Sequence, residues 1–369
     1  MKIGIDVSQL AYPGTGVAVY TQNLIENLLK IDKGNEYLFF FSSMRRKPPK
    51  GWDVKNLKLP PLFLEVLWNR LHVIPIERFI GKIDIFHTSD WLEPPAKCPK
   101  VTTIHDLAIF KFPETFIPRG GHDIVSNLKR KLNLVKEESK LIIAVSENTK
   151  KDIVELLKIP ENKIRVVYEA AGEIFKKQDI AEVERIKKKY EINGNYILAV
   201  GTREPRKNLD RLVESWNLIK DKLPDFELVI IGKFGWGSDL EAGREKIEER
   251  RAKLLGHVPY EDLPGLYSGA QVFVYPSLYE GFGLPILEAM NCACPVVTSN
   301  ISSMPEVAGN AAILVNPESV EEIAQGIWKA LKDKKQMVEK GLKRAEEFSW
   351  ENCARETLKI YEEASDSRN

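Results

Sequence analysis

Short apolar runs alternate with stretches of helical periodicity along the whole chain. In the first half these runs are short enough for buried strands, and they cover residues 1–7, 37–41, 83–86, 101–104, 141–145 and 164–167. Between the first two runs, apolar residues recur with helical spacing over residues 17–30. Strands that alternate with helices predict a parallel sheet with helical crossovers, so the first half is predicted to be α/β.

The alternation stops over residues 170–177 and then begins again. Helices are predicted at 179–190 and 208–222. A second set of strands is predicted at residues 196–200, 227–231, 254–255, 272–275, 296–298 and 313–315. From about residue 319 the pattern is helical to the end, with a break near residues 348–350.

Two doubly wound domains follow from this pattern. We expect a Rossmann-like N-terminal domain over residues 1–172 and a second Rossmann-like domain over 173–348. The terminal helix at 349–369 is expected to pack back on the first domain. Open parallel sheets bind ligands at the carboxyl ends of their strands, so two such domains facing a central cleft place function in the strand-end loops.

Two polar residues stand where predicted helices begin, Ser146 and Asn208. A side-chain oxygen at such a position can accept a hydrogen bond from an unpaired N–H group of the first turn. We therefore expect both residues to be N-caps.

Composition narrows the class of protein. The 369 residues carry 54 Lys+Arg against 53 Asp+Glu, and this net charge of +1 does not indicate a nucleic-acid-binding protein. Apolar residues make up 43%, enough for buried cores, but no run reaches the roughly 18 residues of a membrane span. The start lacks a signal-peptide pattern, and 4 cysteines are too few for a disulfide framework. We expect a cytoplasmic protein.

The segment 276–290, PSLYEGFGLPILEAM, follows a predicted strand and leads into a helix. Glu280 falls in the loop, and Glu288 lies about one turn into the helix. The glycines at 281 and 283 let backbone N–H groups approach a ligand, and the helix N-terminus favours a diphosphate. Two carboxylates here suit sugar or ribose hydroxyls. The alternative is that Glu280 is a plain loop carboxylate and that Glu288 only complements the helix dipole.

A basic segment, GTREPRKN at 201–208, also lies between a strand and a helix. Arg203, Arg206 and Lys207 are suited to stabilise the negative charge that grows on a departing diphosphate. For each of the three, the alternative is a solvated loop cation.

These motifs together resemble a known family. Glu280 and Glu288 within YEGFGLPILEAM, the upstream EPRKN and an N-terminal PGTG are similar to the retaining, nucleotide-sugar-dependent glycosyltransferases of family 4. The resemblance covers nearly the whole chain and implies the GT-B fold of two Rossmann-like domains. The segments HTSDWLEPP and TIHDLAIFKFPE look most like the subgroup that contains bacterial and archaeal mannosyltransferases.

The resemblance implies a donor site in the second domain. In such enzymes the first glutamate, here Glu280, contacts sugar hydroxyls of the donor, and the second, here Glu288, bonds the nucleotide ribose. Backbone N–H groups at Phe282, Gly283 and Leu284 would hold the sugar and phosphate.

The same resemblance assigns the diphosphate and the base. A basic pair ahead of a helix binds the diphosphate, and Lys207 matches one member of it, while Arg206 and Arg203 remain alternatives for the other. The loop after residue 255, around Val258, would contact the base.

The N-terminal half offers a glycine loop. Gly14 and Gly16 lie between a strand and a helix, where backbone donors can approach a phosphate, and the alternative is a plain helix-entry turn. Val19 stands in place of the third glycine of a dinucleotide fingerprint, which argues against NAD binding.

Two histidines stand at strand ends, His105 and His87. In the family, a histidine near His105 contacts the transferred sugar or the acceptor. A structural hydrogen bond is the alternative for each of the two. His122 and His257 are assigned to loops.

Retention of anomeric configuration is also implied by the resemblance. No residue stands out as a nucleophile, so we favour front-face attack, in which the leaving phosphate accepts the proton of the acceptor. Lys207 and an arginine would stabilise the nucleoside diphosphate without a metal, and the chain contains no Asp-x-Asp sequence.

The predicted reaction is hexose transfer to a glycan or lipid-linked oligosaccharide, with GDP-mannose favoured as donor and a UDP-sugar as the alternative. Basic tracts at 44–47 and 129–131 and an apolar-basic stretch at 62–80 are either solvated surfaces or contacts with the inner face of an anionic membrane. Two classes outside the family remain, an NAD-dependent dehydrogenase and a noncatalytic two-lobed sugar-binding protein. The clustered cations argue against the second.

Overall fold

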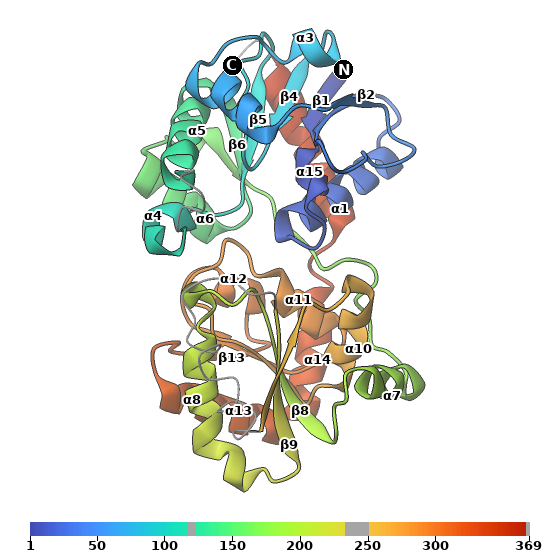
Figure 1. Ribbon diagram of the computed structural model, residues 1–369, viewed down its shortest axis with the longest axis vertical. Helices are drawn as coiled ribbons and strands as arrows, with labels where there is room; N and C mark the ends of the chain where they lie inside the picture. Colours follow the sequence, from blue (N-terminus) through green and yellow to red (C-terminus); the bar gives the residue numbers. More distant parts are fainter. Residues whose placement is uncertain (117–122, 233–250, 367–369) are drawn as a thin grey trace. The chain divides into compact units, whose positions relative to one another are not determined.

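The computed structural model describes residues 1–116, 123–232 and 251–366. The chain divides into two compact units: Met1–Glu169 with Ser349–Asn369, called here the N-terminal unit, and Ala170–Phe348, the C-terminal unit. Each unit is built on a parallel sheet with helices packed on it (Figure 1). The predicted α/β class is therefore confirmed.

The sheet of the N-terminal unit has seven strands in the order β3-β2-β1-β4-β5-β6-β7, all parallel. Its strands are β1 (Lys2–Asp6), β2 (Glu36–Ser42), β3 (Val54–Leu57), β4 (Ile85–Thr88), β5 (Lys100–Ile104), β6 (Ser139–Ala144) and β7 (Ile164–Val166). The sequence pattern missed β3. This short edge strand has no buried residue, so it carries no apolar run.

The helices of the N-terminal unit are α1 (Gly16–Ile31), α2 (Pro61–Leu64), α3 (Glu77–Ile80), α4 (Ala108–Lys111), α5 (Ile124–Glu138), α6 (Glu147–Asp152) and α15 (Trp350–Ser365). Short 3-10 or π turns cover Ser8–Ala11, Glu65–Arg70, Pro113–Thr115, Ile153–Leu157 and Glu161–Lys163. The terminal helix α15 lies beside α1 (Figure 1). Its Trp350 meets the ring of Tyr20 edge-on, with 5.9 Å between ring centroids.

The sheet of the C-terminal unit has six parallel strands in the order β10-β9-β8-β11-β12-β13. They are β8 (Asn195–Val200), β9 (Phe226–Ile231), β10 (Ala252–Gly256), β11 (Val272–Tyr275), β12 (Val296–Ser299) and β13 (Ile313–Val315). Because β8 and β11 are neighbours, the loops that follow them leave the same edge of the sheet side by side.

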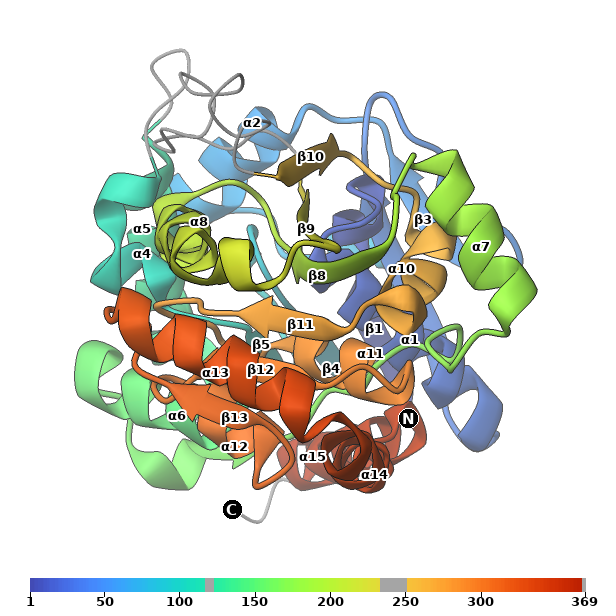
Figure 2. The same ribbon diagram turned by 90° about the horizontal axis from the view of Figure 1, so that it is seen from below.

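The helices of the C-terminal unit are α7 (Ile180–Lys189), α8 (Leu209–Ile219), α10 (Leu263–Gly269), α11 (Leu284–Asn291), α12 (Met304–Ala308), α13 (Val320–Lys332) and α14 (Lys334–Ala345). Short 3-10 turns cover Pro205–Lys207, Lys220–Lys222 and Tyr260–Asp262. Figure 2 shows α8 and α13 on one face of the sheet and α10 and α11 on the other. The apolar stripe of α8 packs with α13 and the strands into one core, in which Leu212 and Trp216 are fully buried.

The two predicted caps have different outcomes. The Ser146 hydroxyl accepts a hydrogen bond from the N–H of Thr149 at 3.0 Å, so the first prediction is confirmed. Asn208 occupies the predicted N-cap position of α8, but its side chain makes no capping hydrogen bond, so this prediction is only half right. Asn208 takes a left-handed conformation, and its amide donates to the carbonyls of Pro276 at 3.0 Å and Pro317 at 2.6 Å. These bonds tie the loop after β8 to the loops after β11 and β13.

Only part of the basic tract at 129–131 lies on the surface, although both interpretations of the sequence took the whole tract as exposed: Lys129 and Arg130 are exposed. Lys131 is only 2% exposed. Burial lowers the pKa of Lys131, although Glu93 and Asp90 partly oppose the shift. Among the described residues, no helix is long and apolar enough to cross a bilayer.

Candidate active site

One carboxylate lies between two cations at the carboxyl ends of β8 and β11. The Lys207 ammonium donates to Glu280 Oε1 at 2.6 Å, and the Arg206 guanidinium donates to Oε2 at 2.9 Å. The three side chains are largely buried: those of Arg206 and Lys207 are each 13% exposed, and that of Glu280 is 10% exposed. The structure thus brings together three residues that the sequence predicted as functional, from positions more than 70 residues apart.

Further contacts hold the two cations in place. Arg206 donates to the carbonyl of Tyr279 at 2.6 Å and to the Glu204 carboxylate at 2.5 Å. Lys207 donates to the hydroxyl of Tyr275 at 3.0 Å. A buried side chain with several partners has little rotamer freedom, so these cations are preorganised for a ligand.

The electrostatics of this cluster depend on burial and on the paired charges. Burial alone would raise the pKa of Glu280, but Lys207 and Arg206 lower it to about 2. Burial lowers the pKa of Lys207, and the neighbouring Glu280 carboxylate opposes this shift. Glu280 is therefore ionised near neutral pH.

The loop between Glu280 and α11 is held by serine hydroxyls. Ser303 Oγ lies 3.0 Å from the carbonyl oxygen of Glu280 and 2.7 Å from that of Phe282. Ser302 Oγ accepts from the N–H of Glu280 at 3.1 Å. Gly283 has φ +107 directly before α11, a conformation that disfavours any side chain. The backbone can therefore approach a ligand at the N-terminus of this helix.

Glu288 lies on α11 and is 7% exposed. The Tyr267 hydroxyl donates to its Oε2 at 3.0 Å. Burial raises the pKa of Glu288 to about 7, and the bond from Tyr267 opposes that rise only in part.

Donor binding should therefore depend on pH near neutrality. An ionised Glu288 can accept hydrogen bonds from both hydroxyls of a ribose, whereas the protonated acid accepts less well. As pH falls through about 7, the Kd of a nucleoside diphosphate should rise by up to about tenfold per pH unit. Calorimetric titration measures this Kd. The nucleotide itself also titrates, and Glu288→Gln controls for this because it should lose the part of the pH dependence of Kd that comes from the protein. If Glu288→Gln showed the same pH dependence of Kd as the wild type, Glu288 would not be the ribose contact.

The other residues predicted for the donor site lie in the same unit and are largely buried. Val258 and Phe282 are 5% and 4% exposed, and Phe282 packs edge-on against Phe348. Leu284 begins α11. Such packed side chains leave only their backbone groups for a ligand. Arg203 is also buried, at 5% exposure, and of the two alternative arginines it is Arg206 that bonds Glu280.

The remaining predicted residues lie in the N-terminal unit. His105 follows β5, and its ring nitrogens contact Glu169 and Ser89. Gly14 has φ +82 and precedes Thr15, whose side chain caps α1, while Gly16 is the first residue of that helix.

His87 has a structural role. It is buried between the hydroxyls of Tyr361 at 2.6 Å and Thr103 at 2.8 Å. Burial lowers its pKa to about 3, so the ring is neutral. Of the loop histidines, His257 is exposed, and His122 lies outside the described residues.

Several residues that contact the predicted residues within each unit were not themselves predicted to be functional. Glu204 stands inside the recognised EPRKN motif, but nothing in the sequence indicated that it would pair with Arg206. The hydroxyls of Tyr275 and Tyr267 belong to residues that the pattern assigns to a strand and a core helix. Glu169 precedes a stretch without periodicity and gave no signal.

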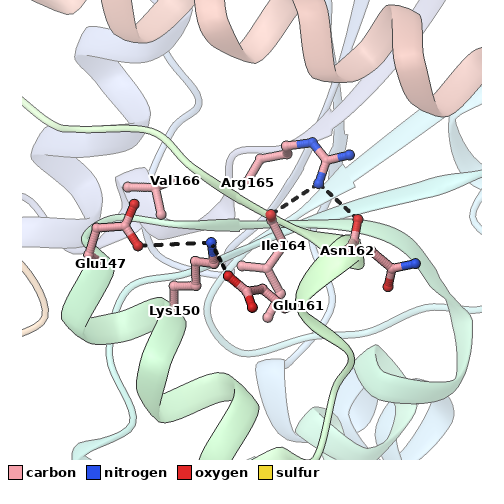
Figure 3. A pocket seen from close by; sticks show the side chains of 7 residues that line it. All are labelled: Glu147, Lys150, Glu161, Asn162, Ile164, Arg165 and Val166. Atoms are coloured by element: carbon pink, nitrogen blue, oxygen red, sulfur yellow. Dashed lines mark hydrogen bonds and ion pairs between the residues drawn. The ribbon is translucent and has the colours of Figure 1, made fainter.

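A surface depression outside the predicted site offers no unpaired charges for a ligand among the described residues that line it. Figure 3 shows an open depression along the edge strand β7 that contains none of the predicted residues. Its charges are already paired, since Lys150 meets Glu147 and Glu161, and Arg165 bonds Glu363. Within residues 1–116, 123–232 and 251–366, no group of three or more His, Cys, Asp or Glu side chains is arranged to hold a metal.

Comparison with known proteins decides the family. Residues 182–347 match the family model described as "Glycosyl transferases group 1", and residues 14–170 match "Glycosyltransferase Family 4". The O-antigen chain mannosyltransferase B of Escherichia coli is 33% identical, over 98% of this chain and 99% of that protein. The chain belongs to the family 4 glycosyltransferases. The predicted family is confirmed, and the dehydrogenase and noncatalytic alternatives are excluded.

Solved structures show the fold of this glycosyltransferase. Sucrose-phosphate synthase from Thermosynechococcus elongatus superposes with a TM-score of 0.76 at 18% identity, over 98% of each chain. HepE of Anabaena, in complex with UDP and glucose, gives a TM-score of 0.71 at 15% identity, over 98% of this chain and 100% of that one. The GT-B fold expected from the sequence is confirmed.

Proposed function

We propose that this glycosyltransferase is a retaining mannosyltransferase that uses GDP-mannose and acts on a glycan or lipid-linked oligosaccharide. The observation that carries the proposal is the buried pair of cations on Glu280, at the edge of the sheet where ligands bind. The full-length likeness to an O-antigen chain mannosyltransferase supports mannose as the transferred sugar. HepE, solved with UDP and glucose, supports a nucleotide-sugar donor and keeps a UDP-sugar as the alternative.

Each donor group has a partner in the C-terminal unit. The diphosphate meets Arg206 and Lys207, Glu280 accepts from sugar hydroxyls, and Glu288 accepts from the ribose. Backbone N–H groups at Phe282, Gly283 and Leu284 approach the sugar and phosphate, and the loop at Val258 meets the base. Gly14 and Gly16 supply backbone donors from the N-terminal unit, where His105 contacts the transferred sugar or the acceptor.

The chemical step that we propose is front-face displacement. The bond between the anomeric carbon and the phosphate oxygen breaks, and the acceptor oxygen bonds to the same face of that carbon. The acceptor proton passes to the leaving phosphate. Negative charge grows on the diphosphate as the bond breaks, and Lys207 and Arg206 stabilise it most strongly in the transition state.

A lipid-linked acceptor would bring the protein to the cytoplasmic face of a membrane, and one surface of the N-terminal unit supports such a contact. Large apolar side chains are exposed along and after α2, namely Leu62, Phe63, Val66, Leu71, Val73 and Ile74. Arg70 is exposed among them. Exposed apolar and basic side chains together favour an anionic lipid surface. Sedimentation with phosphatidylglycerol vesicles tests this contact: the wild type should sediment with the vesicles, and the Phe63→Ser/Ile74→Ser variant should sediment less. If the variant sedimented as much as the wild type, this surface would not be the membrane contact.

A donor panel tests the proposed function. GDP-mannose should be consumed, with release of GDP, in the presence of a mannose-terminated acceptor, and GDP should raise the thermal midpoint more than UDP. If only a UDP-sugar were consumed, the proposed donor would be wrong, but the protein would still be an active glycosyltransferase. If no nucleotide sugar were consumed with a broad acceptor panel, the proposal would fail.

A further inference from the structure

We propose that Glu169 is a positioning residue that holds the ring of His105 with its proton on Nδ1. This inference rests on the proposed function, in which His105 contacts the transferred sugar or the acceptor. It adds a residue for which the sequence gave no signal. The observation behind it is a carboxylate-histidine pair at the carboxyl end of β5.

The geometry joins three segments of the N-terminal unit. Glu169 Oε1 lies 3.2 Å from His105 Nδ1, and Ser89 Oγ lies 3.3 Å from His105 Nε2. The Glu169 side chain is 6% exposed and that of His105 is 15% exposed. The pair is thus nearly enclosed, with the imidazole as its more accessible member.

Aromatic packing sets the plane of the imidazole. The ring of Tyr20 on α1 meets that of His105 edge-on, with 4.6 Å between centroids. Trp350 on α15 also packs against Tyr20, with 5.9 Å between ring centroids. The terminal helix therefore supports the ring through Tyr20, and a ring held on its side needs only one hydrogen bond to fix its rotation.

The chemistry of the partners assigns the proton. A carboxylate oxygen only accepts, so the hydrogen atom of the pair lies on Nδ1, in the neutral ring and in the imidazolium alike. In the neutral ring Nε2 is then the acceptor, and the Ser89 hydroxyl donates to it. A sugar hydroxyl that replaces Ser89 would find an acceptor nitrogen already in place.

Kinetics of matched variants test the inference. Glu169→Ala should lower kcat about tenfold and leave the donor KM within about twofold, because it removes one hydrogen bond that orients a transition-state contact. Glu169→Gln keeps an acceptor oxygen and should retain kcat within about threefold. Glu173→Ala, an exposed carboxylate in the same connecting segment, is the control and should behave as wild type. Equal activity of Glu169→Ala and Glu173→Ala would overturn the proposal.

A spectroscopic readout separates positioning from a general structural role. Nitrogen-15 NMR of labelled histidines distinguishes a protonated from an unprotonated ring nitrogen, and the His105→Asn spectrum assigns the signals. We expect Nδ1 to be protonated in the wild type and in Glu169→Gln, and the proton to redistribute in Glu169→Ala. A wild-type ring protonated on Nε2 alone would overturn the proposal, as would a Glu169→Ala ring unchanged from wild type. This readout needs no turnover, so it stands even if the enzyme proves inactive on every donor, which would refute the proposed function instead.

Discussion

Lys207→Ala should lower kcat by about 10²–10³-fold while changing the donor KM far less. The reason is that the Lys207 ammonium is largely buried, is held by Glu280 and Tyr275, and stabilises the additional negative charge that develops on the diphosphate as the glycosidic bond breaks. Steady-state kinetics with saturating nucleotide sugar measure the effect.

Two further variants make this prediction specific. Lys207→Arg keeps the charge and should recover part of the rate, whereas Glu288→Gln removes a ribose contact and should lose less turnover than Lys207→Ala. Raising the donor concentration should rescue Glu288→Gln only. If Lys207→Ala and Glu288→Gln lost turnover equally, and a higher donor concentration rescued both, Lys207 would act in donor binding. Its assigned role in stabilising the transition state would then be wrong.

Glu280→Gln should lower the thermal midpoint of the free protein and increase the stabilisation that GDP provides. The substitution leaves Lys207 and Arg206 buried without the charge that both contact. Loss of one partner from a buried ion pair costs about 3 kcal/mol, which corresponds to a fall in thermal midpoint of roughly 6–12 °C for a unit of this size. A nucleoside diphosphate would bring replacement charge, so GDP should raise the midpoint of the variant more than that of the wild type.

The control for this prediction is Glu173→Gln, which removes an exposed carboxylate and should leave the midpoint unchanged. Differential scanning calorimetry of the wild type and both variants, each with and without GDP, measures these midpoints. An unchanged midpoint for Glu280→Gln would show that the two cations do not depend on Glu280 for stability. A GDP effect equal to that of the wild type would show that the cations do not contact the diphosphate.

The sequence places Glu280, Lys207 and Arg206 in loops at the carboxyl ends of strands, and so predicts that they face the same cleft. Their contact follows from the strand order, which the structure shows. Both loops follow strands, and strands β8 and β11 are neighbours in a parallel sheet, so their carboxyl ends bring the loops together. The same reasoning cannot say which way a side chain points. For this reason the pairing of Glu204 with Arg206 and the hydroxyl of Tyr275 on Lys207 needed the structure.

Where the sequence misled, contacts from distant segments decided the outcome. Asn208 stands in a capping position, yet its amide bonds two carbonyls from loops far along the chain. Lys131 lies in a basic tract, yet the side chain is buried near Asp90 and Glu93. Glu169 lies beyond any periodic pattern, and only the fold places it on His105.

The configuration of the product is the most direct test of retaining mannosyl transfer. Proton NMR can follow GDP-α-mannose with a mannose-terminated acceptor and purified protein in one tube. We predict that the donor anomeric signal is replaced by that of an α-linked product and that GDP appears in equal amount. A β-linked product, or GDP-mannose that remains intact while a UDP-sugar is consumed, would contradict the proposed reaction.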